Sequence, residues 1–185
     1  MYEEFGQAFS HHMAVLREEM YKKYNRVLPT GELIYNRFDK AKFLKFGDNS
    51  SIYDTSVVMG KVTVGSNAWI GPYTLLDGSG GELIIGNFVS VASGTMIYTH
   101  DSSKYYVSGG REKFETGPVS IGDNTVIGTM AIIGQGVKIG NHCVVAAHSF
   151  VNKDIPDYSI VAGTPAKIIG KVILEGEGVY FEYDK

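Results

Sequence analysis

PVSIGDNTVIGTMAIIGQGVKIGNHCVVAAHSFV, residues 118–151, places an aliphatic residue at every sixth position. The same period occurs earlier in the chain, between residues 52 and 97. An α-helix repeats its faces about every 3.6 residues, whereas six residues are three alternations of a strand. The period therefore excludes helix in these regions and predicts one short strand and one corner in each hexad. The fourteen aliphatic positions are Ile52, Val58, Val64, Ile70, Leu76, Ile85, Val91, Ile97, Ile121, Ile127, Ile133, Ile139, Val145 and Val151.

Two further columns follow the same period. Glycine or alanine comes directly after most of the aliphatic residues, where the chain needs a permissive backbone or little side-chain bulk. Four positions after most of the aliphatic residues comes a small or β-branched residue, such as Thr125, Ala131 or Cys143. Three hexads that close one triangular turn would bring all the aliphatic side chains inward. The pattern thus predicts an all-β solenoid over residues 51–171, in which each turn buries its core on the next.

Length and composition limit the classes of protein that fit. The 185 residues, 20.2 kDa, suit one domain, and 44% apolar residues allow a buried core. A formal charge of −3 without a basic tract argues against nucleic acid as a partner. The only cysteine, Cys143, excludes an internal disulfide and lies in the small inward column, so we interpret it as a core residue and not as a nucleophile. The chain shows no secretory signal layout and no apolar run long enough to span a membrane, and we expect a cytoplasmic protein.

The segments outside the repeats have their own signals. Residues 1–50 carry apolar side chains at helical spacing and predict an N-terminal α-helical cap with a lead-in that covers the first turn. The segment 172–185 is a tail for which the sequence leaves strand or irregular structure open. The helical positions are Phe5, Phe9, Met13, Leu16 and Met20.

Two interruptions of the repeat are candidates for function, because such folds accept insertions at corners and loops carry binding residues. The first, DGSGGE, spans residues 77–82 and predicts a tight corner whose glycines bring the backbone close to another group. The second is an inserted loop over residues 99–118, with HDSSKYYVSGGREKFETG inside it.

The tandem hexads resemble the hexapeptide acyltransferase superfamily, which folds as a left-handed parallel β-helix. The handedness is implied by this resemblance alone, since crossovers between parallel strands are generally right-handed. The run from PVSIGDNTVIG through VKIGNHCVVAAHSFVNKDIPDYSIVAGTPAKIIG is similar to the maltose and galactoside branch of sugar O-acetyltransferases. The closing AGTPAK after the KDIP corner is typical of enzymes that use acyl-CoA.

This resemblance implies a homotrimer whose active sites lie between neighbouring subunits, with acetyl-CoA as the acyl donor in an outer groove and no metal. Small residues admit the pantetheine arm, and lysines can pair with the coenzyme phosphates. By matching positions, the coenzyme contacts are Thr129, Ala147, Asn152, Lys153, Thr164, Pro165 and Lys167.

The residue that matches the family's catalytic histidine is His100 in IYTHDSS. Acetyl transfer to a hydroxyl needs a base, and imidazole titrates near the working pH. Asp101 is a candidate to orient the ring, and a backbone carbonyl or a carboxylate of the next subunit would serve equally well. The implied mechanism is direct transfer without an acyl-enzyme, with the oxyanion stabilised by a backbone N–H at Thr129.

Acceptor binding is assigned to the two interruptions. Tyr105, Tyr106 and Arg111 of the inserted loop can stack on a sugar ring or pair with a nucleotide diphosphate, and Asp77 of the first interruption is a fourth candidate. Many relatives have tryptophan where this chain has Val126, so an aromatic wall near the acceptor is missing.

Three alternatives stay open. An amino-sugar N-acetyltransferase would use the same base and the same coenzyme groove. A trimeric carbonic anhydrase of this architecture would need three histidines, such as His100, His142 and His148, to converge on one metal across a subunit boundary. A structural protein would keep the turns without catalysis. The sequence also leaves open whether His148, in place of a usual glycine, contacts coenzyme A, a neighbouring subunit or solvent.

Overall fold

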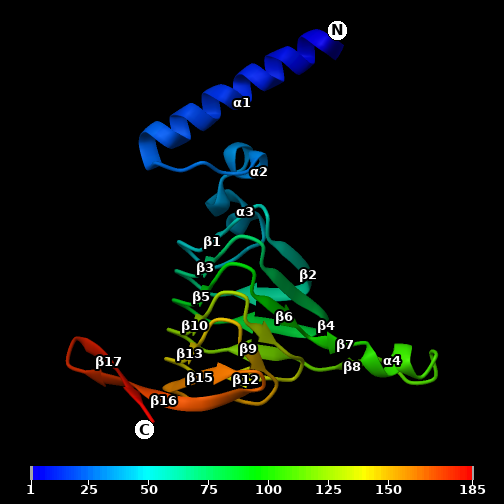
Figure 1. Ribbon diagram of the computed structural model, residues 1–185, viewed down its shortest axis with the longest axis vertical. Helices are drawn as coiled ribbons and strands as arrows, with labels where there is room; N and C mark the ends of the chain where they lie inside the picture. The colour runs from blue at the N-terminus through cyan, green and yellow to red at the C-terminus, as the bar shows by residue number, and fades with distance from the viewer. Residues whose placement is uncertain (1, 185) are drawn as a thin grey trace.

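The protein is described by a computed structural model that covers residues 2–184. The terminal residues Met1 and Lys185, which belong to the predicted cap and tail, lie outside the described residues. Figure 1 shows short strands stacked in successive turns, with a long helix projecting at one end and a hairpin at the other. A further segment projects from the side. The helices are α1 (Tyr2–Tyr24), α2 (Thr30–Ile34), α3 (Arg37–Phe43) and α4 (Ser103–Val107).

Most strands are short, as the hexads predict. They are β1 (Ser51–Ile52), β2 (Val57–Val64), β3 (Trp69–Ile70), β4 (Leu75–Ile85), β5 (Ser90–Val91), β6 (Met96–Tyr98), β7 (His100–Asp101), β8 (Glu115–Thr116), β9 (Val119–Ile121), β10 (Val126–Ile127), β11 (Ile132–Ile133), β12 (Lys138–Ile139), β13 (Val144–Val145), β14 (Phe150–Val151), β15 (Ser159–Gly163), β16 (Ala166–Glu175) and β17 (Gly178–Tyr183).

Strands one turn apart pair in parallel. Val126 of β10 lies opposite Val144 of β13, and Ile132 of β11 lies opposite Phe150 of β14, in each case eighteen residues further on. Eighteen residues are three hexads, so the repeat returns to the same column after every third strand. The strands form one sheet in the order β1-β3-β5-β10-β13-β15-β16-β17 and a second in the order β12-β9-β4-β6-β11-β14, with β2 beside β4. We call β1–β6 and β9–β15 the stack.

One apolar core lies inside the stack, and the aliphatic column supplies it. Thirteen of the fourteen predicted aliphatic residues are buried, from Ile52 to Val151, and Val58 is partly buried against the same core. The prediction for this column is therefore confirmed. Cys143 is fully buried, and burial raises the pKa of its thiol, which confirms that it is a core residue.

Lack of side-chain bulk, and not backbone freedom, explains the glycine column. A Cβ added to Gly122 would lie 2.7 Å from the backbone nitrogen of Asn141 in the next turn. Positive φ angles occur instead at corner residues such as Asn124, Met130 and His148, with values of 56°, 56° and 57°. The glycines therefore let successive turns approach closely, while asparagine and other residues carry the strained corners.

The two ends of the stack are covered differently. Helix α1 is present as predicted, but Met13 is its only buried residue and the helix points away from the strands. The first turn is covered instead by α3, whose Ala41 joins the core together with Phe46. Lys40 of α3 donates hydrogen bonds from Nζ to the carbonyl oxygens of Tyr53, Asp54 and Ser56. Within residues 1–50, the lead-in around Ala41 and Phe46 therefore covers the first turn, and the long helix α1 does not.

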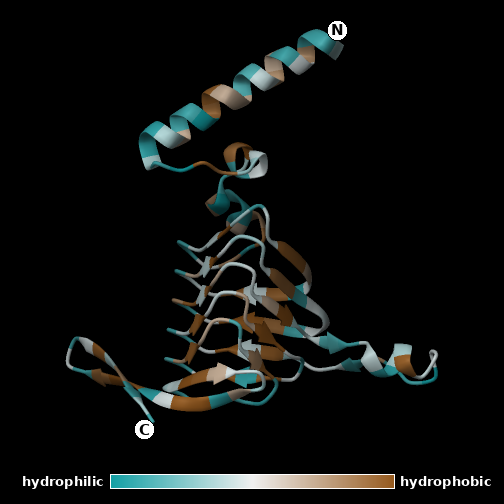
Figure 2. Ribbon diagram, viewed as in Figure 1, coloured by the Kyte–Doolittle hydropathy of each residue, from teal (hydrophilic) through white to brown (hydrophobic). Residues whose placement is uncertain are grey.

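The other end carries an antiparallel hairpin. Strand β16 pairs with β15 on one side and with β17 on the other, so the segment predicted as a tail is strand over most of its length. Figure 2 shows apolar residues along β16. Among residues 2–184, no helix combines the length and the apolar character that crossing a membrane requires.

Inward hydroxyl groups at the corners offer a test of how the turns are held together. Thr95 is fully buried and its Oγ1 donates to the carbonyl oxygen of Gly128, 3.0 Å away. Thr74 lies in the same column, yet its buried Oγ1 has no hydrogen-bond partner among residues 2–184. Thr95→Val is expected to lower the free energy of unfolding by about 1 kcal/mol, and Thr74→Val to leave it unchanged or raise it. Urea unfolding of the two variants measures the difference, and equal losses would contradict the assignment.

Candidate active site

His100 lies where the chain leaves the stack. Strand β6 ends at Tyr98, and β7 begins with His100 and pairs in antiparallel fashion with β8, His100 opposite Thr116. Between β7 and β8 lies helix α4, and Lys104 of this helix forms a 2.7 Å ion pair with Glu115. The predicted inserted loop is therefore an ordered projection, which we call the arm, residues 101–117 (Figure 1).

A buried carboxylate stands beside the imidazole. Asp77 of β4 has no exposed surface, and its Oδ2 lies 2.8 Å from Nδ1 of His100, whose side chain is 28% exposed. The distance is that of an ion pair, without the alignment of a hydrogen bond, and such contacts often tighten when substrate binds. A carboxylate at Nδ1 selects the ring tautomer and leaves Nε2 for chemistry.

Ser79 fixes the other oxygen of Asp77. Its backbone N–H and its hydroxyl both donate to Oδ1, at 2.8 and 2.5 Å, and its Oγ lies 3.5 Å from Nδ1 of His100. Gly80 follows, and a Cβ at that position would lie 2.6 Å from Cβ of His100. The glycine-rich segment thus allows the close approach that the sequence predicts. The corner predicted there is wrong, because DGSGGE stays within strand β4, opposite a register shift in β2.

Two sequence assignments need correction. Asp77 was expected to bind substrate, but a carboxylate with no accessible surface lies behind His100 and cannot meet a substrate directly. Asp101 was a candidate to orient the ring, but its Oδ1 accepts a 2.7 Å hydrogen bond from the N–H of Ser103 at the start of α4. Hydrogen bonds from Ser103 lower the pKa of the Asp101 carboxyl. Asp77 is the carboxylate that contacts the imidazole of His100.

An open pocket of about 250 Å³ lies in front of His100. Its walls come from three successive turns of the stack and from the start of the arm. The lining residues are Tyr98, His100, Asp101, Ser102, Ile132, Gly134, Gln135 and Phe150. Tyr98 and Phe150 give this pocket an aromatic wall, although tryptophan is absent at Val126. The available signal was their outward position, each next to an inward aliphatic residue on strands that stack on one another.

Four of the predicted coenzyme residues fall on the two corners that flank strands β11 and β14. Thr129 and Ala147 precede these strands on one corner, where the N–H of His148 donates to the carbonyl oxygen of Thr129 and Oγ1 of Thr164 donates to that of His148. The backbone N–H groups of Thr129 and Ala147 have no acceptor within residues 2–184. Both residues are exposed at this corner.

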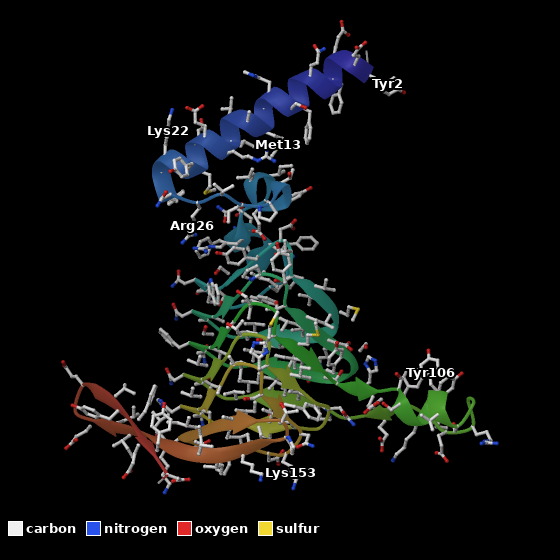
Figure 3. All side chains as sticks on the ribbon, in the orientation of Figure 1. Tyr2, Met13, Lys22, Arg26, Tyr106 and Lys153 are labelled. Carbon is white, nitrogen blue, oxygen red and sulfur yellow. The ribbon has the colours of Figure 1, made fainter. Side chains whose placement is uncertain are left out.

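The remaining coenzyme candidates lie further from this corner. Asn152 and Lys153 follow β14 at its other end, and Lys153 lies near the lower end of the stack in Figure 3. Pro165 precedes β16, and Lys167 belongs to it; both are exposed. None of the seven candidates lines the pocket in front of His100, so within residues 2–184 the structure places them along the outside of the stack and not at the imidazole.

The arm carries the remaining acceptor candidates. Tyr105 and Tyr106 of α4 are exposed and meet edge to face, with ring centroids 5.2 Å apart. Arg111 is exposed beyond α4. Figure 3 shows Tyr106 well out along the arm, away from the stack. None of these three side chains lines the pocket in the single chain.

The histidines do not converge. His142 lies at one corner and stacks on Tyr158, with centroids 4.9 Å apart, while His148 lies at the next corner and His100 beyond the end of β6. Among residues 2–184, no group of three or more His, Cys, Asp or Glu side chains could hold a metal ion.

Comparisons with known proteins agree with the stacked hexads. Residues 118–153 match the family described as bacterial transferase hexapeptide, six repeats. The chain is 38% identical over 124 residues to serine acetyltransferase 4 of Arabidopsis thaliana, covering 63% of this chain and 32% of that protein. It is 34% identical over 108 residues to a chloramphenicol acetyltransferase of Morganella morganii, covering 49% and 51%. The chain thus spans a third to a half of the length of these curated relatives.

Solved structures extend the match to most of the chain. AntD, an N-acyltransferase from Bacillus cereus in complex with dTDP and 3-hydroxybutyryl-CoA, is 32% identical with a TM-score of 0.60, over 67% of this chain and 70% of that one. The hexapeptide-repeat acetyltransferase VCA0836 of Vibrio cholerae is 26% identical with a TM-score of 0.66, over 89% and 91%. With its buried aliphatic column, its parallel strands eighteen residues apart and this similarity, the chain belongs to the bacterial transferase hexapeptide family.

Proposed function

We propose that this protein transfers an acetyl group from acetyl-CoA to a hydroxyl of a sugar or nucleotide sugar, with His100 as general base. The observation that carries the proposal is the fully buried Asp77 carboxylate, 2.8 Å from Nδ1 of an imidazole that faces an open pocket. An alcohol is a poor nucleophile until its proton is leaving. An imidazole that contacts a carboxylate can act as the general base that removes this proton.

The proposed reaction is a direct transfer. Nε2 of His100 takes the hydroxyl proton while the oxygen attacks the thioester carbonyl carbon. The resulting oxyanion is held by the unpaired N–H of Thr129 of a neighbouring subunit, because Thr129 of the same chain does not line the pocket at His100. Its collapse expels the thiolate of coenzyme A. The thiolate then receives the proton from the imidazolium, which leaves coenzyme A, the acetyl ester and a neutral His100.

The coenzyme would lie along the outside of the stack. Thr129 and Ala147 offer free amide donors to the pantetheine arm, and Asn152 lies at the other end of the same strands. Lys153 and Lys167 carry exposed ammonium groups for the phosphates, with Thr164 and Pro165 near the nucleotide. AntD and the acetyltransferase domain of PglB from Neisseria gonorrhoeae, which shares the fold at 22% identity, were solved with acyl-CoA bound.

The similarity to hexapeptide-repeat transferases supports a left-handed parallel β-helix that assembles as a homotrimer. Outward apolar side chains form a column across neighbouring strands beside the pocket, and several of them are substantially exposed. A second copy placed against this column would cover it, close the open pocket and bring an arm with Tyr105, Tyr106 and Arg111 to a neighbouring site. The column consists of Val57, Leu75, Met96, Ile132 and Phe150. Sedimentation at micromolar concentration should give about three times 20.2 kDa, and a monomer would contradict intersubunit sites.

Amino-sugar N-acetylation is the second candidate, favoured by the likeness to AntD, an N-acyltransferase solved with dTDP. Release of thiol from acetyl-CoA with sugars, amino sugars and nucleotide sugars tests both. The assay has little protein background, because the single thiol, Cys143, is buried. Hydroxylamine cleaves an ester product and spares an amide, so the product itself tells the two apart. No thiol release with any acceptor would contradict the proposed activity. We place the reaction in the cytoplasm, where acetyl-CoA is available.

A further inference from the structure

A phenyl ring of the arm lies against the imidazole of His100. Phe114, just before β8, stacks on His100 with ring centroids 5.9 Å apart and planes 17° from parallel. Tyr98 meets the same imidazole edge to face, at 6.4 Å and 86°. The ring of His100 is therefore bounded by Asp77 at Nδ1, by Tyr98 at an edge-to-face contact and by Phe114 on one face.

The arm is built so that Phe114 stays at this place. Tyr105 packs on Phe114 edge to face, with centroids 5.1 Å apart, and Tyr106 lies 6.4 Å away. The backbone of the next residue, Glu115, is fixed by its pairing with Asp101 in β7. Phe114 is 43% exposed, so burial in a core does not explain its position. Its ring contacts are with Tyr105 and Tyr106 of the arm and with His100.

We propose that Phe114 is a positioning residue that fixes the plane of the His100 imidazole. The inference rests on the proposed function, since it gives the base its orientation. The Nδ1 contact with Asp77 lacks the alignment of a hydrogen bond, so this contact alone leaves the ring free to tilt. A stacked phenyl ring restricts the tilt, and proton transfer depends steeply on such alignment.

The kinetic test compares two substitutions at position 114. Phe114→Ala is expected to lower kcat by roughly ten- to a hundredfold, the loss typical of a slightly misplaced catalytic group, with little change in KM for acetyl-CoA. Phe114→Tyr keeps the stacked ring and should retain most of the activity. Glu115→Gln is the matched control. It removes the exposed ion pair of the arm but keeps the contact between the rings of Phe114 and His100, so kcat should stay within about twofold. Equal losses in the three variants would show that only the order of the arm matters and would overturn the proposal.

A second readout does not depend on turnover. In NMR spectra the ring proton at Cε1 of His100, identified by its loss in His100→Gln, should be displaced by the ring current of Phe114. In Phe114→Ala it should move toward the position of a free imidazole, and the nitrogen shifts should show a changed tautomer balance. A resonance that does not move, or a kcat for Phe114→Ala within twofold of wild type, overturns the proposal. If the wild type transfers no acetyl group to any acceptor, the proposed function fails, and the NMR comparison still decides whether Phe114 orients the ring.

Discussion

His100→Ala is expected to lower the turnover of acetyl-CoA by roughly a hundred- to ten-thousandfold, the range lost when a general base is removed. The imidazole is the titratable group that both faces the open pocket and contacts a buried carboxylate. Without it, the acceptor hydroxyl keeps its proton as it approaches the thioester. Thiol release at saturating acceptor measures the loss, and circular dichroism checks that the strands remain.

A matched histidine provides the control for this experiment. His142 is stacked on Tyr158 at another corner, so His142→Ala removes an imidazole of similar setting without touching the pocket. Its turnover should stay close to that of the wild type. An unchanged rate in His100→Ala would remove this residue from the mechanism.

Asp77→Asn is the second substitution with a large expected effect. The amide keeps the size of the side chain and can still accept the two hydrogen bonds from Ser79, but it no longer carries the charge beside Nδ1. Turnover should fall between roughly tenfold, as for carboxylate partners of metal-bound histidines, and the roughly ten-thousandfold loss known for serine protease triads. Steady-state thiol release measures the effect, and thermal unfolding reports any loss of stability.

Asp101→Asn separates the two carboxylates. Asp101 holds the start of α4 through the N–H of Ser103, an interaction that asparagine can also make. A much smaller loss is therefore expected than for Asp77→Asn. The reverse order, with the larger loss at Asp101, would contradict the assignment of Asp77 as the orienting carboxylate.

The residues of the core could be predicted because their signal is local. A six-residue period fixes which side chains point inward whatever lies next to each strand, so the column from Ile52 to Val151 is buried as expected. Val58 is the exception: it lies on β2, an edge strand that pairs only with β4, and it stays partly buried. The glycine column was also visible, but only the distance between turns shows that it reflects close packing.

The interruptions could be located in the sequence, but their structure could not be predicted. DGSGGE breaks the phase of the repeat, which suggested a corner, yet β2 opposes it with an irregularity of its own and the segment continues as strand β4. The polar insertion after residue 99 gave no period and was described as a loop. Pairing of β7 with β8 and the aromatic contacts of Phe114 make it an ordered arm.

From the sequence alone come the stacked architecture, the core and the position of His100, since a repeat period and a motif are properties of neighbouring residues. Tertiary structure decided the rest of the site. Asp77 and His100 are 23 residues apart and meet because β4 lies beside β6, with Asp77 opposite Tyr98. Phe114 reaches the imidazole only because the arm folds back through β8. Contacts of this kind depend on which strand becomes the neighbour of which, and that choice is made by the packing of the whole chain.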